Sequence, residues 1–130
     1  MVGIGIDAVE VDRFRRVLGR RPGLAGRLFT DGERAGTAGP DPAPRLAARF
    51  AAKEAVMKAL GVGLGAFAFH DVEVVPLASG APTLVLSGRA AILAAELGVA
   101  GWRISLTHTD SMAEAVVVAL GAAAGESSSP

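Results

Sequence analysis

Two acidic residues stand where a metal ion could bind. Asp7 follows a short apolar segment, Val2–Ile6, and Glu54 lies inside a long run of helix-forming residues. Carboxylates on two separate elements can share a hard cation such as Mg²⁺, which fills its other positions with water and phosphate oxygens. The simpler alternative is that Asp7 caps the following helix and that Glu54 pairs with Lys58 one turn later. The spacing alone leaves both interpretations open.

Basic residues surround Glu54 on the same predicted helix. Arg49, Lys53 and Lys58 could form a phosphate clamp next to the metal. Arg45 and Arg49 would extend the row that Glu54 and Lys58 begin. The alternative is that these charges are only the solvated face of a helix.

Two further features could serve a phosphate-containing ligand. His108 ends the run ISLTH, where a strand is expected to meet a loop, and histidine can bind phosphate or handle a proton near neutral pH. His70 opens another predicted strand without polar neighbours, so we interpret it as structural. Glycines at 61, 63 and 65 would let the backbone pass close to a nucleotide, although on their own they are more typical of a flexible turn.

These residues require a scaffold of short strands and one long helix. The segment 45–60 consists of strong helix formers and ends at Gly61, which predicts the longest helix. Shorter helices are predicted at 9–18, after a capping box at Thr30, and at 88–97 with Ser87 as its cap; strands are predicted at 2–6, 71–76, 83–87, 103–107 and 113–120. The two glycines in the first strand often mark close approach by a ligand or another backbone. This order predicts a single α+β domain over residues 1–121, with a mainly antiparallel sheet packed on one long central helix, and a disordered tail at 122–130.

Composition narrows the class of protein. A formal net charge of zero argues against a nucleic-acid binder, and the absence of cysteine excludes disulfides and thiolate metal sites. The apolar runs are short, so we expect no membrane span and a cytoplasmic protein. The charge is nevertheless uneven, because the segment 13–27 holds six arginines and no acid. Such a segment suits an acidic partner, or is an ordinary solvated helix face.

Several segments together resemble the holo-acyl-carrier-protein synthase group of the 4′-phosphopantetheinyl transferases. They follow the order of that family along nearly the whole chain: GIGID at 3–7, Leu-Phe-Thr at 28–30, RFAAKEAVMKA at 49–59, the G-x-G-x-G turn, Ser-Gly-Ala-Pro at 79–82 and ISLTHT at 104–109. The pattern F-x-x-K-E-A-x-x-K-A with an upstream G-I-D is highly specific. The resemblance implies the 4′-phosphopantetheinyl transferase fold and a homotrimer with each site at the boundary of two subunits.

The resemblance also implies roles for individual residues. Asp7 and Glu54 would ligate Mg²⁺, and Lys58 would face the transferred phosphate. The residues implied to contact coenzyme A are Arg45, Arg49, Lys58, Gly63, Gly65, Gly80, Pro82, His108 and Thr109. Arg13, Arg20 and Arg27 match basic positions that face the carrier protein.

The implied reaction moves the 4′-phosphopantetheine arm of coenzyme A to a serine of apo-acyl carrier protein and releases 3′,5′-ADP. The serine proton could go to Glu54, to His108 or to a metal-bound water, and the sequence does not choose among them. Fatty acid or polyketide biosynthesis would use the product. The alternatives are a catalytically silent trimer that binds coenzyme A or a nucleotide, and a purely structural trimer. A silent binder would not need both Asp7 and Glu54, and both are present.

Overall fold

The computed structural model describes residues 1–122. Their elements are, in order, β1 (Gly3–Glu10), α1 (Val11–Arg20), α2 (Leu24–Leu28), α3 (Asp31–Gly36), α4 (Ala43–Leu60), the 3₁₀ helix η1 (Phe69–Asp71), β2 (Val72–Pro76), β3 (Pro82–Leu86), α5 (Gly88–Glu96), β4 (Val99–His108) and β5 (Met112–Gly121). The tail predicted to be disordered lies outside the described residues, apart from Ala122. None of the helices within residues 1–122 is long and apolar enough to cross a membrane.

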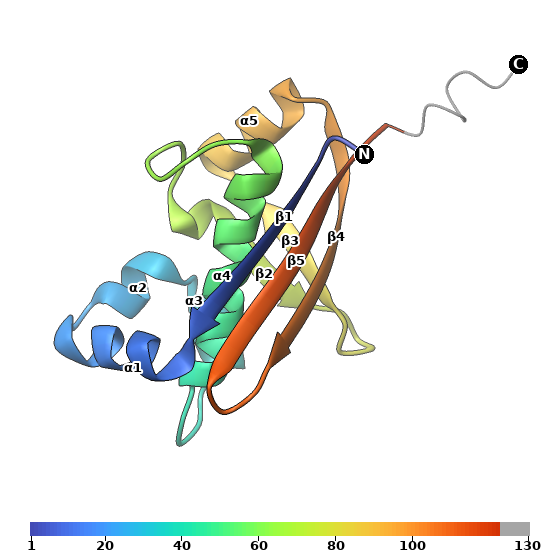
Figure 1. Cartoon of the computed structure of the whole chain (residues 1–130). Coiled ribbons are helices and arrows are strands. Elements are labelled where there is room, and N and C mark those ends of the chain that lie inside the picture. The colour runs from blue at the N-terminus through green and yellow to red at the C-terminus, as the bar shows by residue number, and fades with distance from the viewer. Residues whose placement is uncertain (123–130) are drawn as a thin grey trace, which may run out of the picture.

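The long helix α4 lies between two antiparallel sheets. Strands β1, β5 and β4 form one sheet in that order, and β2 pairs with β3 in the other (Figure 1). Both sheets are antiparallel throughout, with Ile6 opposite Val116 and Val74 opposite Leu84. Helices α1, α2 and α3 cover one end of α4, and α5 lies at the other end (Figure 1). The predicted α+β fold with a central helix is therefore confirmed.

Strand β1 lies directly against the backbone of α4. A Cβ atom added at Gly3 would lie 1.8 Å from the carbonyl oxygen of Ala59, and one at Gly5 would lie 1.9 Å from that of Ala55. No side chain fits at such distances, so only glycine lets the strand come this close. The expected close approach is thus made by another backbone. Because alternate residues of a strand share a face, Asp7 continues the face that touches α4.

The helix α4 begins two residues earlier than predicted and ends as predicted. Proline in its first turn lacks only an N–H that has no helical partner, so Ala43 and Pro44 belong to the helix. At the other end Gly61 has φ +71°, the left-handed conformation that glycine adopts most readily.

Some predicted boundaries were wrong because pairing with β5 extends the strands. Strand β1 continues past Asp7 to Glu10, and β4 begins at Val99 and not at Arg103. The predicted cap of α5 was also wrong, because Ser87 makes no side-chain capping bond. Ala90 N–H instead donates to Asp71 Oδ2 at 3.3 Å, so a carboxylate from η1 caps this helix. The capping box of α3 at Thr30 and Glu33 is confirmed.

Candidate functional site

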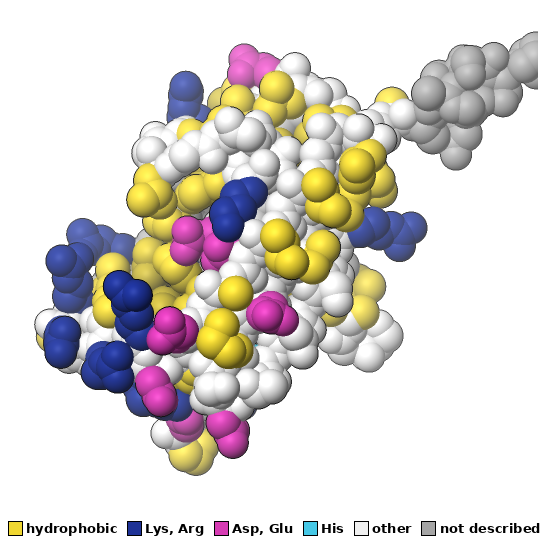
Figure 2. All heavy atoms as spheres, in the orientation of Figure 1, with side chains coloured by type: hydrophobic (Ala, Val, Ile, Leu, Met, Phe, Trp, Pro, Cys, Tyr) yellow, Lys and Arg dark blue, Asp and Glu magenta, His cyan; other side chains and the backbone are white. Residues whose placement is uncertain are grey.

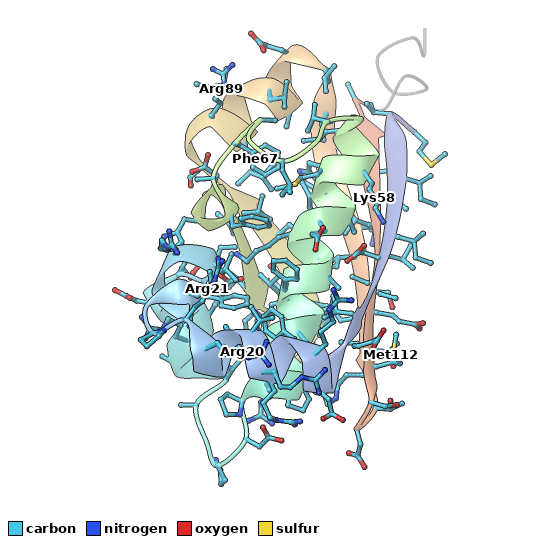
Figure 3. All side chains as sticks on the ribbon, turned by 60° about the vertical axis from the view of Figure 1, so that its left-hand side comes forward. Arg20, Arg21, Lys58, Phe67, Arg89 and Met112 are labelled. Carbon is cyan, nitrogen blue, oxygen red and sulfur yellow. The ribbon has the colours of Figure 1, made fainter. Side chains whose placement is uncertain are left out.

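The first cluster joins β1 to the last turn of α4. Lys58 Nζ donates to Asp7 Oδ1 and to the carbonyl oxygen of Ile6, both at 2.9 Å. Figure 3 shows the Lys58 side chain reaching from α4 toward β1. Lys58 therefore pairs with Asp7 and not with Glu54, and the residue before α1 is Glu10 and not Asp7. Both parts of the simpler alternative were wrong.

Glu54 completes this group, which we call the acidic cluster: Asp7, Glu54 and Lys58. Burial raises the pKa of Glu54, the negative charge of Asp7 raises it further, and Lys58 opposes the rise. The two carboxylates repel each other, and the positive charge of Lys58 offsets only part of that repulsion. A divalent cation would relieve this repulsion, so the pair suits a hard metal ion.

The second cluster lies in a pocket of about 260 Å³ that we call the arginine pocket. Its walls include Arg45, Arg49, Gly80, Pro82 and His108, which come from α4, the β2–β3 turn, β3 and the end of β4. These five residues are far apart in the sequence. All five were predicted to contact one ligand, and the fold brings them to one place.

Arg49 is the side chain of this pocket with an unsatisfied group. Its Nε is buried without a hydrogen-bond partner, while Nη1 donates to the carbonyl oxygen of Arg45 at 3.2 Å. Burial lowers the pKa of Arg49, and the charge of Glu33 partly offsets this. A buried donor without a partner is costly in a folded protein unless a ligand supplies one. The guanidinium of Arg49, on the wall of the arginine pocket, is therefore a candidate anion-binding group.

The two clusters lie on different faces of α4. Arg49 and Lys58 are nine positions apart, about two and a half turns of helix, so they project to opposite sides. The prediction that Arg45 and Arg49 extend the row of Glu54 and Lys58 was therefore wrong. Lys53 is not a phosphate clamp either, because its ammonium is fully buried and pairs with Glu33.

Besides Lys58, three predicted ligand-binding residues lie outside the arginine pocket. Gly63 and Gly65 follow α4, where Gly65 has φ +91° and the intervening Leu64 is exposed. Thr109 N–H and the carbonyl oxygen of Met112 close the β4–β5 turn at 2.7 Å. The Thr109 hydroxyl also accepts from Met112 N–H at 3.1 Å. In this structure Thr109 therefore shapes the turn that follows His108.

The interpretation of His70 needs one correction. Its Nε2 contacts the carbonyl oxygen of Gly26 in α2, so it does have a polar partner. This contact ties η1 to α2, which agrees with the structural role that was predicted.

A larger cavity of about 590 Å³ opens beside Glu54, and we call it the apolar pocket. Its walls include Phe14, Phe50, Phe69 and Leu64, with Arg13 also on the wall. The rings of Phe14 and Phe50 have centroids 5.2 Å apart, and those of Phe50 and Phe69 are 5.4 Å apart. This site was not predicted from the sequence, because aromatic residues on separate elements look like ordinary core residues.

Basic side chains gather next to the apolar pocket. Figure 2 shows arginine side chains over α1 and α2, beside a hollow lined with apolar groups. Not all of these arginines are free, because Arg15 bonds to Asp12 at 2.5 Å and to Asp41 at 2.8 Å. Arg13, on the pocket wall, belongs to the segment 13–27.

Comparisons with known proteins agree with this geometry. Residues 3–118 match the 4′-phosphopantetheinyl transferase superfamily. The chain is 54% identical to the holo-[acyl-carrier-protein] synthase of Frankia casuarinae over 119 residues, which cover 92% of this chain and 97% of that protein. The corresponding synthase of Salinispora arenicola is 51% identical over 120 residues, with 92% and 98% covered.

Solved structures give the same result. The holo-[acyl-carrier-protein] synthase of Neisseria meningitidis superposes with a TM-score of 0.83 at 33% identity, covering 92% of this chain and 98% of that one. The Helicobacter pylori enzyme in complex with coenzyme A gives a TM-score of 0.80 at 29% identity, covering 90% and 99%. The expected fold and enzyme class are thereby confirmed. The chain belongs to the holo-[acyl-carrier-protein] synthase group of the 4′-phosphopantetheinyl transferase superfamily.

Proposed function

We propose that this enzyme transfers the 4′-phosphopantetheine arm of coenzyme A to a serine of apo-acyl carrier protein and releases 3′,5′-ADP. The observation that carries the proposal is the arginine pocket, which gathers five residues expected to contact coenzyme A. The acidic cluster supplies the groups for the transfer, and the family relationship supports both.

The arginine pocket is suited to the phosphates of coenzyme A. Arg45 and Arg49 offer planar guanidinium donors, which pair well with phosphate oxygens. Arg45 is held by a bond from its Nη2 to the carbonyl oxygen of Thr37 at 3.2 Å, so it is already positioned. The buried Nε of Arg49 gains a partner when an anion binds. His108 lies on the same wall and adds a third donor.

Asp7 and Glu54 are the residues that would hold Mg²⁺. Within residues 1–122 no group of three or more histidine, aspartate or glutamate side chains could hold a metal ion, so the proposal rests on this pair. The residues fit, because Mg²⁺ is commonly bound through one or two carboxylates together with phosphate oxygens of the substrate. The bound ion would neutralise charge on the pyrophosphate of coenzyme A.

The side chains of the acidic cluster have separate tasks. Lys58 is 54% exposed, so its ammonium can turn from Asp7 to a phosphate and stabilise the charge that builds up there. The serine oxygen forms a bond to the phosphorus next to the pantetheine arm, and the bond from that phosphorus to 3′,5′-ADP breaks. We assign the serine proton to Glu54, a carboxylate that lines the apolar pocket where the carrier would bind.

We propose that the enzyme is a homotrimer in which two chains complete each site. The acidic cluster and the arginine pocket lie on opposite sides of α4, so one chain presents two half-sites. The outer face of the β1–β5–β4 sheet is apolar and exposed, with Ile4 at 58%, Ile6 at 64% and Val116 at 36%. An exposed apolar face of this kind is typical of a subunit contact.

The carrier would bind over α1 and α2. An acidic helix can place carboxylates on Arg13, Arg20 and Arg27 while an apolar side chain enters the apolar pocket next to Glu54. A charged rim around an apolar centre is the usual arrangement of a protein interface. We propose carriers of fatty acid or polyketide biosynthesis as acceptors and the cytoplasm as the location.

The proposed function has a direct test. The protein is incubated with coenzyme A, Mg²⁺ and an apo-carrier, and the carrier is weighed by mass spectrometry. We expect a mass gain of one phosphopantetheine group, which is abolished by EDTA and by Asp7→Ala while circular dichroism shows an intact fold. An unmodified carrier together with tight coenzyme A binding would show that the protein is a silent binder.

A further inference from the structure

A buried ion pair next to the acidic cluster has no part in the proposed chemistry. Lys53 immediately precedes Glu54, yet its side chain is fully buried and its Nζ lies 2.7 Å from Glu33 Oε1. Glu33 is fully buried too. Neither side chain can touch a substrate, although Lys53 belongs to the most specific sequence pattern of the chain.

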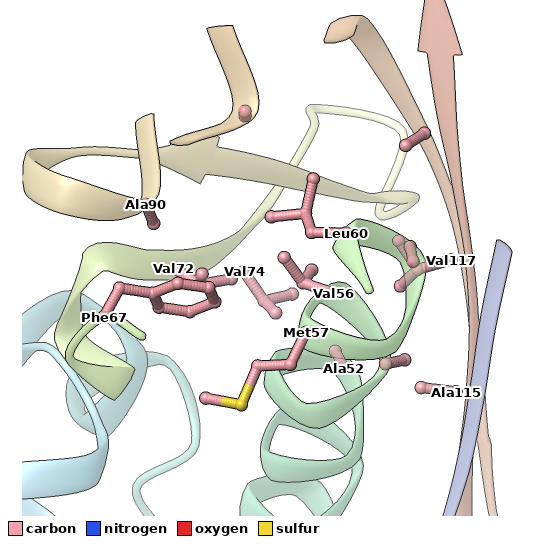
Figure 4. Packing of buried hydrophobic residues seen from close by; sticks show 14 of the residues in the cluster. Ala52, Val56, Met57, Leu60, Phe67, Val72, Val74, Ala90, Ala115 and Val117 are labelled. Atoms are coloured by element: carbon pink, nitrogen blue, oxygen red, sulfur yellow. The ribbon is translucent and has the colours of Figure 1, made fainter. Parts of the chain in front are cut away.

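The pair satisfies backbone groups of three other segments. Lys53 Nζ also donates to the carbonyl oxygens of Phe69, at 3.1 Å, and Val72. Glu33 accepts from the N–H of Thr30 at 3.0 Å and from that of Val74 at 2.9 Å. Val72 and Val74 place their side chains in the core against α4 (Figure 4), while their backbone groups bond to the pair.

Stability alone is a weak reason to bury two charges, because desolvation can exceed the attraction between them. What distinguishes this pair is its connections, which join α3, α4, η1 and β2. A nonpolar pair would leave three backbone groups without partners, since the carbonyl oxygen of Phe69 also accepts from Val72 N–H. The pair therefore determines where these elements lie relative to one another.

The positioned elements form the wall that faces the carrier. Helix α2, directly before Thr30, carries Arg27 and contributes Leu24 and Leu28 to the apolar pocket. The ring of Phe69, whose carbonyl oxygen accepts from Lys53, lines the same pocket. On the other side, Glu54 follows Lys53 on α4.

We propose that Glu33 and Lys53, with Thr30 at the edge of the network, are positioning residues that set the carrier-binding wall at a fixed place relative to Glu54. They act through the backbone groups they hold and touch no substrate. The inference rests on the proposed function, and it predicts that disturbing the network weakens carrier binding selectively.

Thr30 allows a test that spares the buried charges. Its hydroxyl accepts from Glu33 N–H at 3.1 Å and donates to Glu73 Oε2 at 2.6 Å. Thr30→Val removes both bonds with little change in shape, and Thr30→Ser keeps the hydroxyl. We expect Thr30→Val to raise the KM for the carrier at least about three-fold. Its kcat and its KM for coenzyme A should stay within about two-fold of the parent. Thr30→Ser should have a KM for the carrier close to that of the parent.

Thr37→Val is the matched control. Its hydroxyl, which is more deeply buried than that of Thr30, lies at the other end of α3 and donates to the carbonyl oxygen of Glu33 at 2.9 Å, not to the charged groups of the ion pair. A purely structural role predicts that both valine variants lower the melting temperature and affect transfer alike. The positioning role predicts that both lose stability, but that only Thr30→Val raises the KM for the carrier.

The outcomes are decisive. Equal kinetic effects in Thr30→Val and Thr37→Val, an unchanged KM for the carrier, or a loss confined to kcat would overturn the inference. If Thr30→Val does not fold, Glu73→Gln is the substitute, because it weakens the hydrogen bond to Thr30 from the partly exposed side. This variant must then raise the KM for the carrier. A parent protein that modifies no carrier refutes the proposed function itself, whereas an active parent with an unchanged Thr30→Val refutes only this inference.

Discussion

Removing the charge of Glu54 should stabilise the metal-free protein while it abolishes transfer. The carboxylate is partly desolvated and repelled by Asp7, which together raise its pKa. Each unit of pKa shift corresponds to about 1.4 kcal/mol, but solvent screens a half-buried group, so we expect Glu54→Gln to gain about 0.5–1 kcal/mol at pH 7. For a chain of this size that corresponds to a rise in melting temperature of roughly 2–5 °C.

The direction of this change in stability can be checked by varying the pH. A carboxyl whose pKa is higher in the folded state binds more protons when folded, so stability falls as pH rises from its ordinary value through the raised one. The advantage of Glu54→Gln should therefore be largest above the raised pKa and vanish in acid. The assay is thermal unfolding in EDTA at several pH values, followed by addition of Mg²⁺, which should stabilise only the parent. A variant less stable than the parent in EDTA at pH 7 would refute the electrostatic reasoning.

Three further predictions concern other parts of the site. Lys58→Ala should lower kcat more than it weakens coenzyme A binding, whereas Arg49→Ala should mainly weaken binding; kinetics and calorimetry giving the opposite division would exchange the two roles. Reversing Arg13 and Arg20 to Glu should raise the KM for the carrier several-fold and reduce the salt dependence of that KM, while the KM for coenzyme A stays unchanged. Arg15→Glu is the control, and it should change the KM for the carrier much less, because Arg15 is already bonded to Asp12 and Asp41. Gly5→Ala should lower the free energy of unfolding by about 1–3 kcal/mol or more and impair transfer, because its Cβ would lie 1.9 Å from a carbonyl oxygen of α4. Gly19→Ala, with open space around it, should be neutral or stabilising in a denaturant titration.

Local signals were enough to predict most of the elements. The helix-forming run that ends at Gly61, the capping box at Thr30 and the strand at 113–120 all appear close to where they were expected. What failed depends on partners distant in the sequence. Strand β4 is longer than its own pattern suggested because β5 pairs with it, and α5 takes its cap from Asp71, a residue no local rule would connect with it.

The candidate site was only partly predictable. Residue types and family pattern named Asp7, Glu54, Arg49 and His108, and the structure assigns them to two clusters. The faces of α4 could have been separated from helical geometry alone, because Arg49 and Lys58 differ by about half a turn beyond two turns. The burial of Lys53 could not, because its partner Glu33 lies on another helix and a charged residue in a helix is usually exposed.

Because the two half-sites of one chain face different neighbours in the proposed assembly, two impaired variants should complement each other. A chain with Asp7→Ala still offers a sound arginine pocket, and one with Arg49→Ala still offers a sound acidic cluster. Random mixing of equal amounts would make about one quarter of the subunit boundaries intact in both halves. The restored activity would appear only after the chains exchange, and its rate of appearance would report how fast subunits leave the assembly.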